Sequence, residues 1–102
     1  MNSYFNESID RMFAVITGIR DETECRAFFE DLCTIKELQD MAQRLDTAIL
    51  LHQGFSYQKI ADKVGVSTAT ISRVNRALTY GANGYRTAIK RIAETEKQND
   101  DQ

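Results

Sequence analysis

The residues with the clearest chemical potential are the cations of residues 54–91, a segment that opens with GFSYQKIADKVGVSTATISRVNR. It holds seven of the chain's thirteen Lys and Arg residues against one acid, Asp62, for a net charge of +6. The seven are Lys59, Lys63, Arg73, Arg76, Arg86, Lys90 and Arg91. Solvated helix faces usually mix both signs of charge, so this imbalance favours contact with a polyanion.

The remainder of the chain is acidic. Residues 1–53 contain ten acids and five bases, and residues 92–102 contain four acids and one base, which gives −5 and −3. The total charge of −2 therefore conceals a polarised molecule that can present one positive surface to phosphate groups.

The spacing within the basic segment predicts two short helices joined by a tight turn. Ser56 can cap a helix over residues 57–64, and Ser67 can cap a second helix. Helices that cross steeply need a small residue at the approach, a glycine able to take positive φ, and branched apolar residues facing inward. The chain has these at Ala61, Gly65, Ile71 and Val74. Together they predict a helix-turn-helix over residues 54–80.

The second helix of this unit would keep a slim polar face outside. Small side chains near its N-terminus would let it enter a major groove and meet base edges, while arginines further along reach guanine or phosphate. The start of the first helix is expected to contact phosphate, partly through backbone amides. The candidate DNA-binding residues are Tyr57, Gln58, Lys59, Lys63, Ser67, Thr68, Ala69, Thr70, Arg73 and Arg76.

The rest of the chain is also predicted to be helical, because it has no proline and only five glycines. Apolar residues from Phe5 to Ile16 recur at helical steps and predict a first helix that stops near Gly18. Two capping boxes, Asp21 with Glu24 and Thr34 with Glu37, predict a second helix and a third that ends near His52. A last apolar stripe predicts a helix over residues 84–98, followed by a frayed tail at residues 99–102.

Length and composition fit one domain spanning residues 1–102. With 42% hydrophobic residues and no long apolar run, we expect one modest core and no membrane segment. The acidic start, MNSYFNESID, is unlike a secretory signal, so we expect a cytoplasmic location. Cys25 and Cys33 are expected to be reduced, since two cysteines make no disulfide framework and, even with His52, lack the spacing of a zinc site.

No catalytic arrangement is indicated. His52 has no Ser or Cys partner at a spacing typical of a triad, and its place at a predicted helix C-terminus favours a capping role. The carboxylates of Glu22, Glu24, Glu30 and Asp31 are expected on solvated helix surfaces. We therefore expect a protein that is not an enzyme and needs no metal or cofactor.

Residues 28–92 resemble the Trp repressor superfamily, and specifically its YerC/YecD subgroup. The resemblance rests on FFEDLCTIKELQDMAQRLDTAILL leading into GFSYQKIADKVGVSTATISR, and above all on the runs DLCT, AQRL and STATISRV followed by YG. It implies an all-α, six-helix fold in which two chains interlace their N-terminal helices into an intertwined homodimer. Residues 1–53 would then be the dimerisation helices, and each chain would present one helix-turn-helix.

Pairing also has a physical reason, because two helices about a two-fold axis read half-sites roughly 34 Å apart and so multiply selectivity. We expect a sequence-specific regulator of transcription, most simply a repressor, that binds a palindromic site in double-stranded DNA as a homodimer. One alternative is a protein-interaction module built on the same scaffold. A third reading, RNA binding, is disfavoured because the basic segment lacks paired aromatic residues for stacking bases.

The resemblance also implies a candidate effector pocket. In Trp repressor the indole lies between two arginines, which Arg44 and Arg73 match, and Thr34 matches a threonine beside the pocket. The neighbours depart from that pattern: Val74 replaces a glycine, Ala77 a serine and Asp31 an apolar residue. Because Val74 is expected to fill the volume that the indole needs, tryptophan is not expected as a corepressor, and a different small effector stays open.

Overall fold

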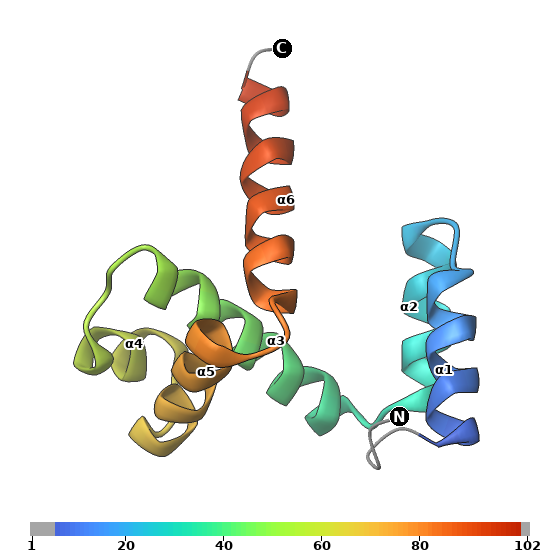
Figure 1. Cartoon of the computed structure of the whole chain (residues 1–102), viewed down its shortest axis with the longest axis horizontal. Coiled ribbons are helices and arrows are strands. Elements are labelled where there is room, and N and C mark those ends of the chain that lie inside the picture. The colour runs from blue at the N-terminus through green and yellow to red at the C-terminus, as the bar shows by residue number, and fades with distance from the viewer. Residues whose placement is uncertain (1–5, 101–102) are drawn as a thin grey trace. The chain divides into compact units, whose positions relative to one another are not determined.

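Six α-helices form the described part of the chain, residues 6–100 of a computed structural model (Figure 1). In chain order they are α1 (Glu7–Thr17), α2 (Glu22–Leu32), α3 (Ile35–His52), α4 (Tyr57–Val64), α5 (Thr68–Tyr80) and α6 (Gly84–Asp100). The predicted all-α class and the six helices are confirmed. Phe5 and residues 101–102, which belong to the predicted first stripe and to the predicted tail, lie outside the described residues.

The chain divides into two compact units, Met1–Leu38 and Gln39–Gln102. The first unit contains α1, α2 and the start of α3, and the second contains the rest of α3 with α4, α5 and α6.

Side-chain caps start the helices of the first unit. Asn6 Oδ1 accepts from the Ile9 N–H at 3.0 Å, and Asp21 Oδ1 accepts from the Glu24 N–H at 2.8 Å. The Glu24 carboxylate reaches back to the N–H of Arg20 at 2.6 Å, one residue before the cap, whereas a standard capping box ends on the cap residue itself.

The second capping box has the standard form. Thr34 Oγ1 accepts from the Glu37 N–H at 3.1 Å, and Glu37 Oε1 accepts from the Thr34 N–H at 2.8 Å. Both predicted helix starts are therefore confirmed, because each pair satisfies backbone donors that a helix leaves without an intrahelical partner.

The first unit leaves much of its apolar surface open. No described residue of α1 or α2 is buried. Phe28 and Phe29 meet edge to face with ring centroids 5.4 Å apart. Phe13, Val15 and Leu32 are 45%, 46% and 50% exposed. Both thiols, at Cys25 and Cys33, are free and half-buried. These short helices therefore have apolar faces that they do not cover themselves.

The second unit has a core of its own around α5. Ala48, Val74 and Ile89 form a buried cluster, against which Ile49, Leu51, Leu78 and Tyr85 pack. Ile60 of α4 and Ile71 of α5 are fully buried. Each such side chain contributes about 1.5 to 3 kcal/mol by leaving water. The inward positions predicted at Ala61, Ile71 and Val74 are confirmed, because Ile71 and Val74 are buried and Ala61 is half-buried.

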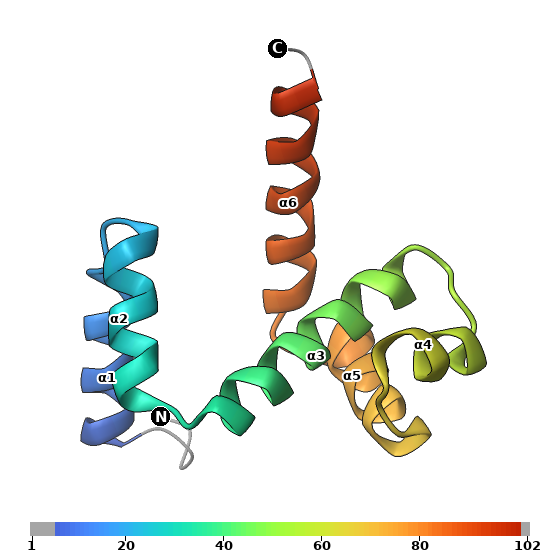
Figure 2. The same ribbon diagram turned by 180° about the vertical axis from the view of Figure 1, so that it is seen from behind.

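Two glycines allow the turns on either side of α4. Gly54, after α3, has φ +89°, and Gly65, after α4, has φ +84°. The Gly65 N–H donates to the Ala61 carbonyl at 2.9 Å, which ends α4 in the left-handed conformation that favours glycine. The chain then enters α5 after only two further residues. Figures 1 and 2 show α4 and α5 packed together near the C-terminal half of α3.

The last helix is longer than predicted. It extends to Asp100, two residues beyond the expected end at residue 98. Among the described residues, no helix combines the length and apolar character needed to cross a membrane.

Candidate nucleic-acid interface

The outward face of α5 is polar, narrow and cationic. Ile71 and Val74 are buried, and Leu78 is half-buried against the core. The residues on the opposite side are exposed: Thr68, Ala69, Ser72, Arg73 and Arg76. The predicted inward and outward positions of this helix are therefore confirmed. Side chains at its N-terminal end are short, and the guanidinium groups lie further along, so the helix can approach a duplex closely at its start.

Two predicted contact residues at the start of α5 also bond each other. Ser67 Oγ accepts from the Thr70 N–H at 3.1 Å and donates to Thr70 Oγ1 at 3.1 Å. Thr70 is half-buried, whereas Ser67 is exposed. The Ser67 hydroxyl thus serves first as the helix cap, and the neighbouring Thr68 and Ala69 are exposed.

The start of α4 places three predicted residues at a helix N-terminus. Ser56 Oγ accepts from the Lys59 N–H at 3.2 Å, and Tyr57 is 36% exposed. Gln58 Nε2 donates to Asp62 Oδ1 at 3.1 Å, so the one acid of residues 54–91 is engaged along the helix by a neutral amide. This leaves the ammonium of Lys59 as the charged group of the first turn.

The electrostatics of these two helix starts suit an anion. Neither α4 nor α5 has an acidic residue in its first turn, and both are capped by a neutral serine hydroxyl. A helix N-terminus carries roughly half a positive charge and presents backbone N–H groups, which together bind phosphate. Since no carboxylate offsets that charge, α4 and α5 keep their N-termini available to an incoming anion.

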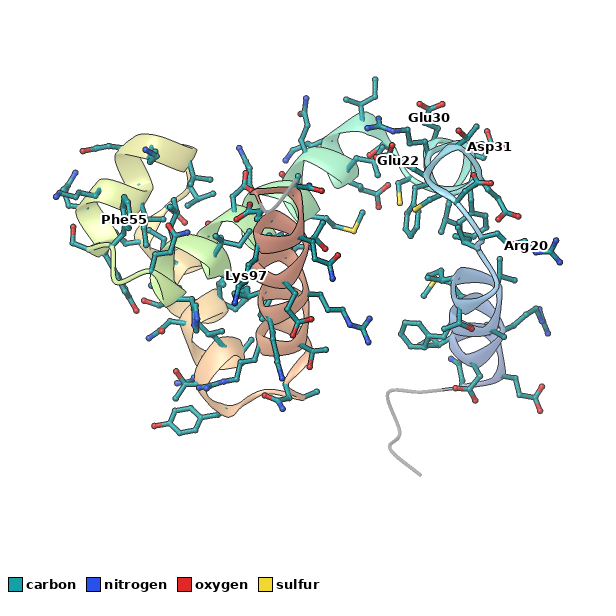
Figure 3. All side chains as sticks on the ribbon, turned by 90° about the horizontal axis from the view of Figure 1, so that it is seen from above. Arg20, Glu22, Glu30, Asp31, Phe55 and Lys97 are labelled. Atoms are coloured by element: carbon teal, nitrogen blue, oxygen red, sulfur yellow. The ribbon has the colours of Figure 1, made fainter. Side chains whose placement is uncertain are left out.

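Lys63 differs from the other predicted contacts. It belongs to the last turn of α4, where a cation is favoured by the helix dipole. Its Nζ lies 5.8 Å from the centroid of the Phe55 ring. Phe55 belongs to the turn between α3 and α4 (Figure 3). Lys63 also lines a groove with Asp46 and Leu50 of α3. The structure therefore places Lys63 beside Phe55 and beside residues of α3 in its own unit.

The three residues of the candidate effector pocket belong to different units of the chain. Thr34 caps α3 in the first unit, and Arg44 and Arg73 belong to the second unit. Val74, which stands where Trp repressor has a glycine, is 2% exposed and packs with Ala48 and Ile89. Its isopropyl group occupies core volume, as predicted.

A separate cavity of about 630 Å³ lies between the end of α3 and α6. Ile49, Ile89 and Ile92 give it apolar walls, and His52, Arg86 and Lys90 stand around it. None of Thr34, Arg44 or Arg73 lines it, so the cavity is not the pocket inferred from the resemblance.

The acidic residues of the first unit are surface groups. Glu22, Glu30 and Asp31 are exposed and project from α2 (Figure 3). Glu22 pairs with Arg26 at 3.5 Å, and both side chains are more than two-thirds exposed. Within residues 6–100, no group of three or more His, Cys, Asp or Glu residues is placed to hold a metal ion.

Comparison with known protein families finds one that matches most of this chain. The profile described as Trp repressor protein matches residues 7–93. The YerC protein of Bacillus subtilis (strain 168), itself described as uncharacterized, is 48% identical over 92 residues, which cover 90% of this chain and 88% of that protein.

Two crystal structures have the same fold. A TrpR-like protein from Eubacterium eligens ATCC 27750 matches with a TM-score of 0.85 and 41% identity, over 91% of this chain and 96% of that one. A candidate Trp repressor from Staphylococcus aureus matches with a TM-score of 0.82 and 39% identity, over 88% and 90%. The resemblance found in the sequence is thus confirmed, and the chain belongs to the Trp repressor family, a family of regulators and not of enzymes.

Proposed function

We propose that this protein is a cytoplasmic, homodimeric regulator of transcription, most simply a repressor, that binds a palindromic operator in double-stranded DNA. The observation that carries the proposal is the outward face of α5. It combines short exposed side chains at a helix N-terminus without acids with two exposed arginines further along. Such a surface fits the major groove and the phosphates beside it.

The roles of individual residues follow from their places on the two helices. Tyr57, Gln58 and Lys59 contact phosphate at the start of α4, aided by the backbone amides of that turn. Ser67, Thr68, Ala69 and Thr70 face base edges, and of these Thr70 is half-buried. Arg73 and Arg76 reach guanine or phosphate. Lys63 adds positive charge at longer range, because its ammonium lies over Phe55.

The first unit supports the proposal of a homodimer. Its helices bury none of their described residues, and Phe13 and Leu32 are about half exposed. Isolated helices of about eleven residues are marginal in water and need apolar packing to persist. A second copy of the chain, interlaced through α1 and α2, would supply that packing and would pair two α5 helices about one axis.

Selection of bound fragments from genomic DNA by the purified full chain tests the proposal. We expect enrichment of a palindrome whose half-sites are spaced by about one helical turn, roughly 34 Å. Enrichment of no sequence, or of a single asymmetric site bound by one chain, would contradict it.

One observation favours the alternative of a protein-interaction module. Tyr80, at the end of α5, is 85% exposed, and an aromatic ring of this kind often anchors a protein interface. The two readings differ in electrostatics. DNA binding must weaken steeply with salt, whereas an interface centred on Tyr80 would weaken little.

We propose further that operator binding does not require tryptophan. Val74 fills the position where the resemblance places open volume for the indole. Space for an aromatic ring would have to come from displacing a side chain that packs against Ala48 and Ile89.

A further inference from the structure

One cation of the basic segment bonds the protein's own backbone. The Arg86 Nε–H donates to the Leu78 carbonyl at 2.9 Å, which joins the first turn of α6 to the last turn of α5. The two residues are eight positions apart. The bond therefore closes the short connection between these helices at the point where α5 ends.

The end of α5 needs such a partner. A helix leaves its last carbonyls without intrahelical donors, and α5 has no basic residue in its last turn. The Ala77 carbonyl is satisfied by the Gly81 N–H at 2.8 Å. Gly81 has no room for a side chain in this conformation, since a Cβ there would overlap that carbonyl oxygen. The next carbonyl, that of Leu78, is the one that Arg86 reaches.

The dipole of α5 favours a cation at the position of Arg86, whereas the dipole of α6 disfavours it. A cation in the first turn of α6 opposes that helix's own dipole, whereas the same cation at the C-terminus of α5 complements it. The side chains beside the bond also belong to the core, since Leu78 and Tyr85 pack against Val74 and Ile89. Arg86 is thus bonded to a part of α5 that packs against the core.

We propose that Arg86 is a positioning residue: its hydrogen bond to Leu78 fixes the C-terminal end of α5, and so the angle at which the outward face of that helix meets DNA. This inference rests on the proposed function. The start of α5 is held by Ser67 and its middle by Ile71 and Val74. Arg86 holds its end, so its charge matters less for DNA binding than its Nε–H.

Two substitutions separate the donor from the charge. In R86Q the amide Nε2 stands the same number of bonds from Cα as the arginine Nε, so a donor is kept and the charge is lost. In R86K the charge is kept, but a methylene replaces Nε and the ammonium donors stand one bond further from Cα than the Nε–H. R91Q, on the exposed next turn of α6, serves as the matched control for losing one charge from this helix.

Affinity for the most enriched genomic fragment is measured for all variants at one salt concentration, after thermal melts show that they are folded. R86K is expected to bind about three- to tenfold more weakly than wild type, while R86Q matches R91Q within about twofold. A direct phosphate contact gives the reverse order, because phosphate contact depends on charge. That reverse order, equal losses in both variants, or wild-type affinity in R86K would overturn the proposal.

Amide hydrogen exchange without DNA tests the same bond independently. In R86K the Gly81 amide, whose partner is the Ala77 carbonyl, is expected to exchange about three- to tenfold faster than in wild type, and in R86Q at the wild-type rate. Unchanged protection in R86K would overturn the positioning of α5. If wild type binds no DNA fragment, the proposed function fails together with the role in DNA binding, whereas the exchange rates still decide whether Arg86 fixes this helix end.

Discussion

The helices of the first unit and those of the helix-turn-helix begin in electrostatically opposite ways. The first turns of α1, α2 and α3 all contain acids, namely Glu7 and Asp10, Glu22 and Glu24, and Glu37. Those of α4 and α5 contain none, and serine hydroxyls cap them. An acid at this place stabilises a helix by about 0.3 to 1 kcal/mol, but it also repels an anion. α4 and α5 therefore lack a common source of helix stability at the helix ends that we propose contact phosphate.

The two units differ equally in burial. In the second unit, Ile60 and Ile71 are fully buried, and Ala48, Val74 and Ile89 form a cluster. In the first, no described residue of α1 or α2 is buried. One unit therefore has a core that can hold a recognition surface, and the other has apolar surface for a partner.

The largest effect is expected from charging the apolar surface of α1. Phe13→Asp places a carboxylate at a residue that we expect a second copy to cover, so the dimer should dissociate. Because binding by two linked modules gains a factor of 10² to 10⁴ over one, affinity for a palindromic fragment should fall at least about 100-fold. Sedimentation gives the oligomeric state. Ser8→Asp, which adds the same charge at an exposed polar site of α1, should leave both properties unchanged.

An exchange of cap residues tests the electrostatic contrast directly. Ser67→Asp keeps a capping oxygen on α5 but adds a negative charge, so the melting temperature should hold or rise while DNA affinity falls about 100-fold, since like-charge contact costs several kcal/mol. Asp21→Ser gives α2 the neutral cap of the other region and should change DNA affinity by less than about twofold. Equal losses of affinity in the two variants would refute the contrast.

Arg73→Ala should have the next largest effect. If the guanidinium reads a guanine, the loss is about 1 to 3 kcal/mol of binding free energy and specificity relaxes at one position. If it contacts phosphate, binding weakens uniformly and the dependence of log K on log salt becomes shallower by about 1 per protomer. Titrations at several salt concentrations separate the two cases. Unchanged affinity together with an unchanged slope would remove Arg73 from the interface.

Lys59 and Lys63 form a natural pair, one turn apart on α4. Lys59→Ala should make the salt dependence shallower by about 1 per protomer, because its ammonium stands at the helix start. Lys63→Ala should change the slope by less than half as much, because its Nζ lies 5.8 Å from the Phe55 ring centroid. Equal slopes in the two variants would show that Lys63 also reaches phosphate.

The smallest effect is expected from tryptophan. Since Val74 is 2% exposed and fills its position, adding L-tryptophan should change operator affinity by less than about twofold. Isothermal titration with the amino acid alone should show no heat of binding. Tightening of DNA binding by tenfold or more would mean that the side chains around Val74 open to admit an indole.

Local signals in the sequence predicted the helices well. Caps at Asp21, Ser56 and Ser67 act over three or four residues, and the positive φ of Gly65 depends on the absence of its own side chain, so each can be inferred from neighbouring residues. The inward residues of α5, Ile71 and Val74, followed from the need of a steep helix crossing for branched apolar residues that face the first helix.

Contacts between helices could not be predicted in this way. The bond from Arg86 to Leu78 and the place of Lys63 over Phe55 both depend on how the chain turns between helices, and both engage cations that the sequence alone suggested for an anionic partner. Net charge counts every cation alike, whereas the structure shows which of them contact the protein itself. The family match supports the fold, whereas the assignment of individual residues to DNA contact stays a prediction.

We propose that α4 and α5, and not the acidic helices, contact DNA. Amide chemical shifts of the isotope-labelled full chain, recorded with and without the most enriched DNA fragment, test it residue by residue. The largest changes should fall at residues 57–59 and 67–73, with those of α1 and α2 small. Changes concentrated in α1 and α2, or confined to the surroundings of Tyr80, would contradict the account.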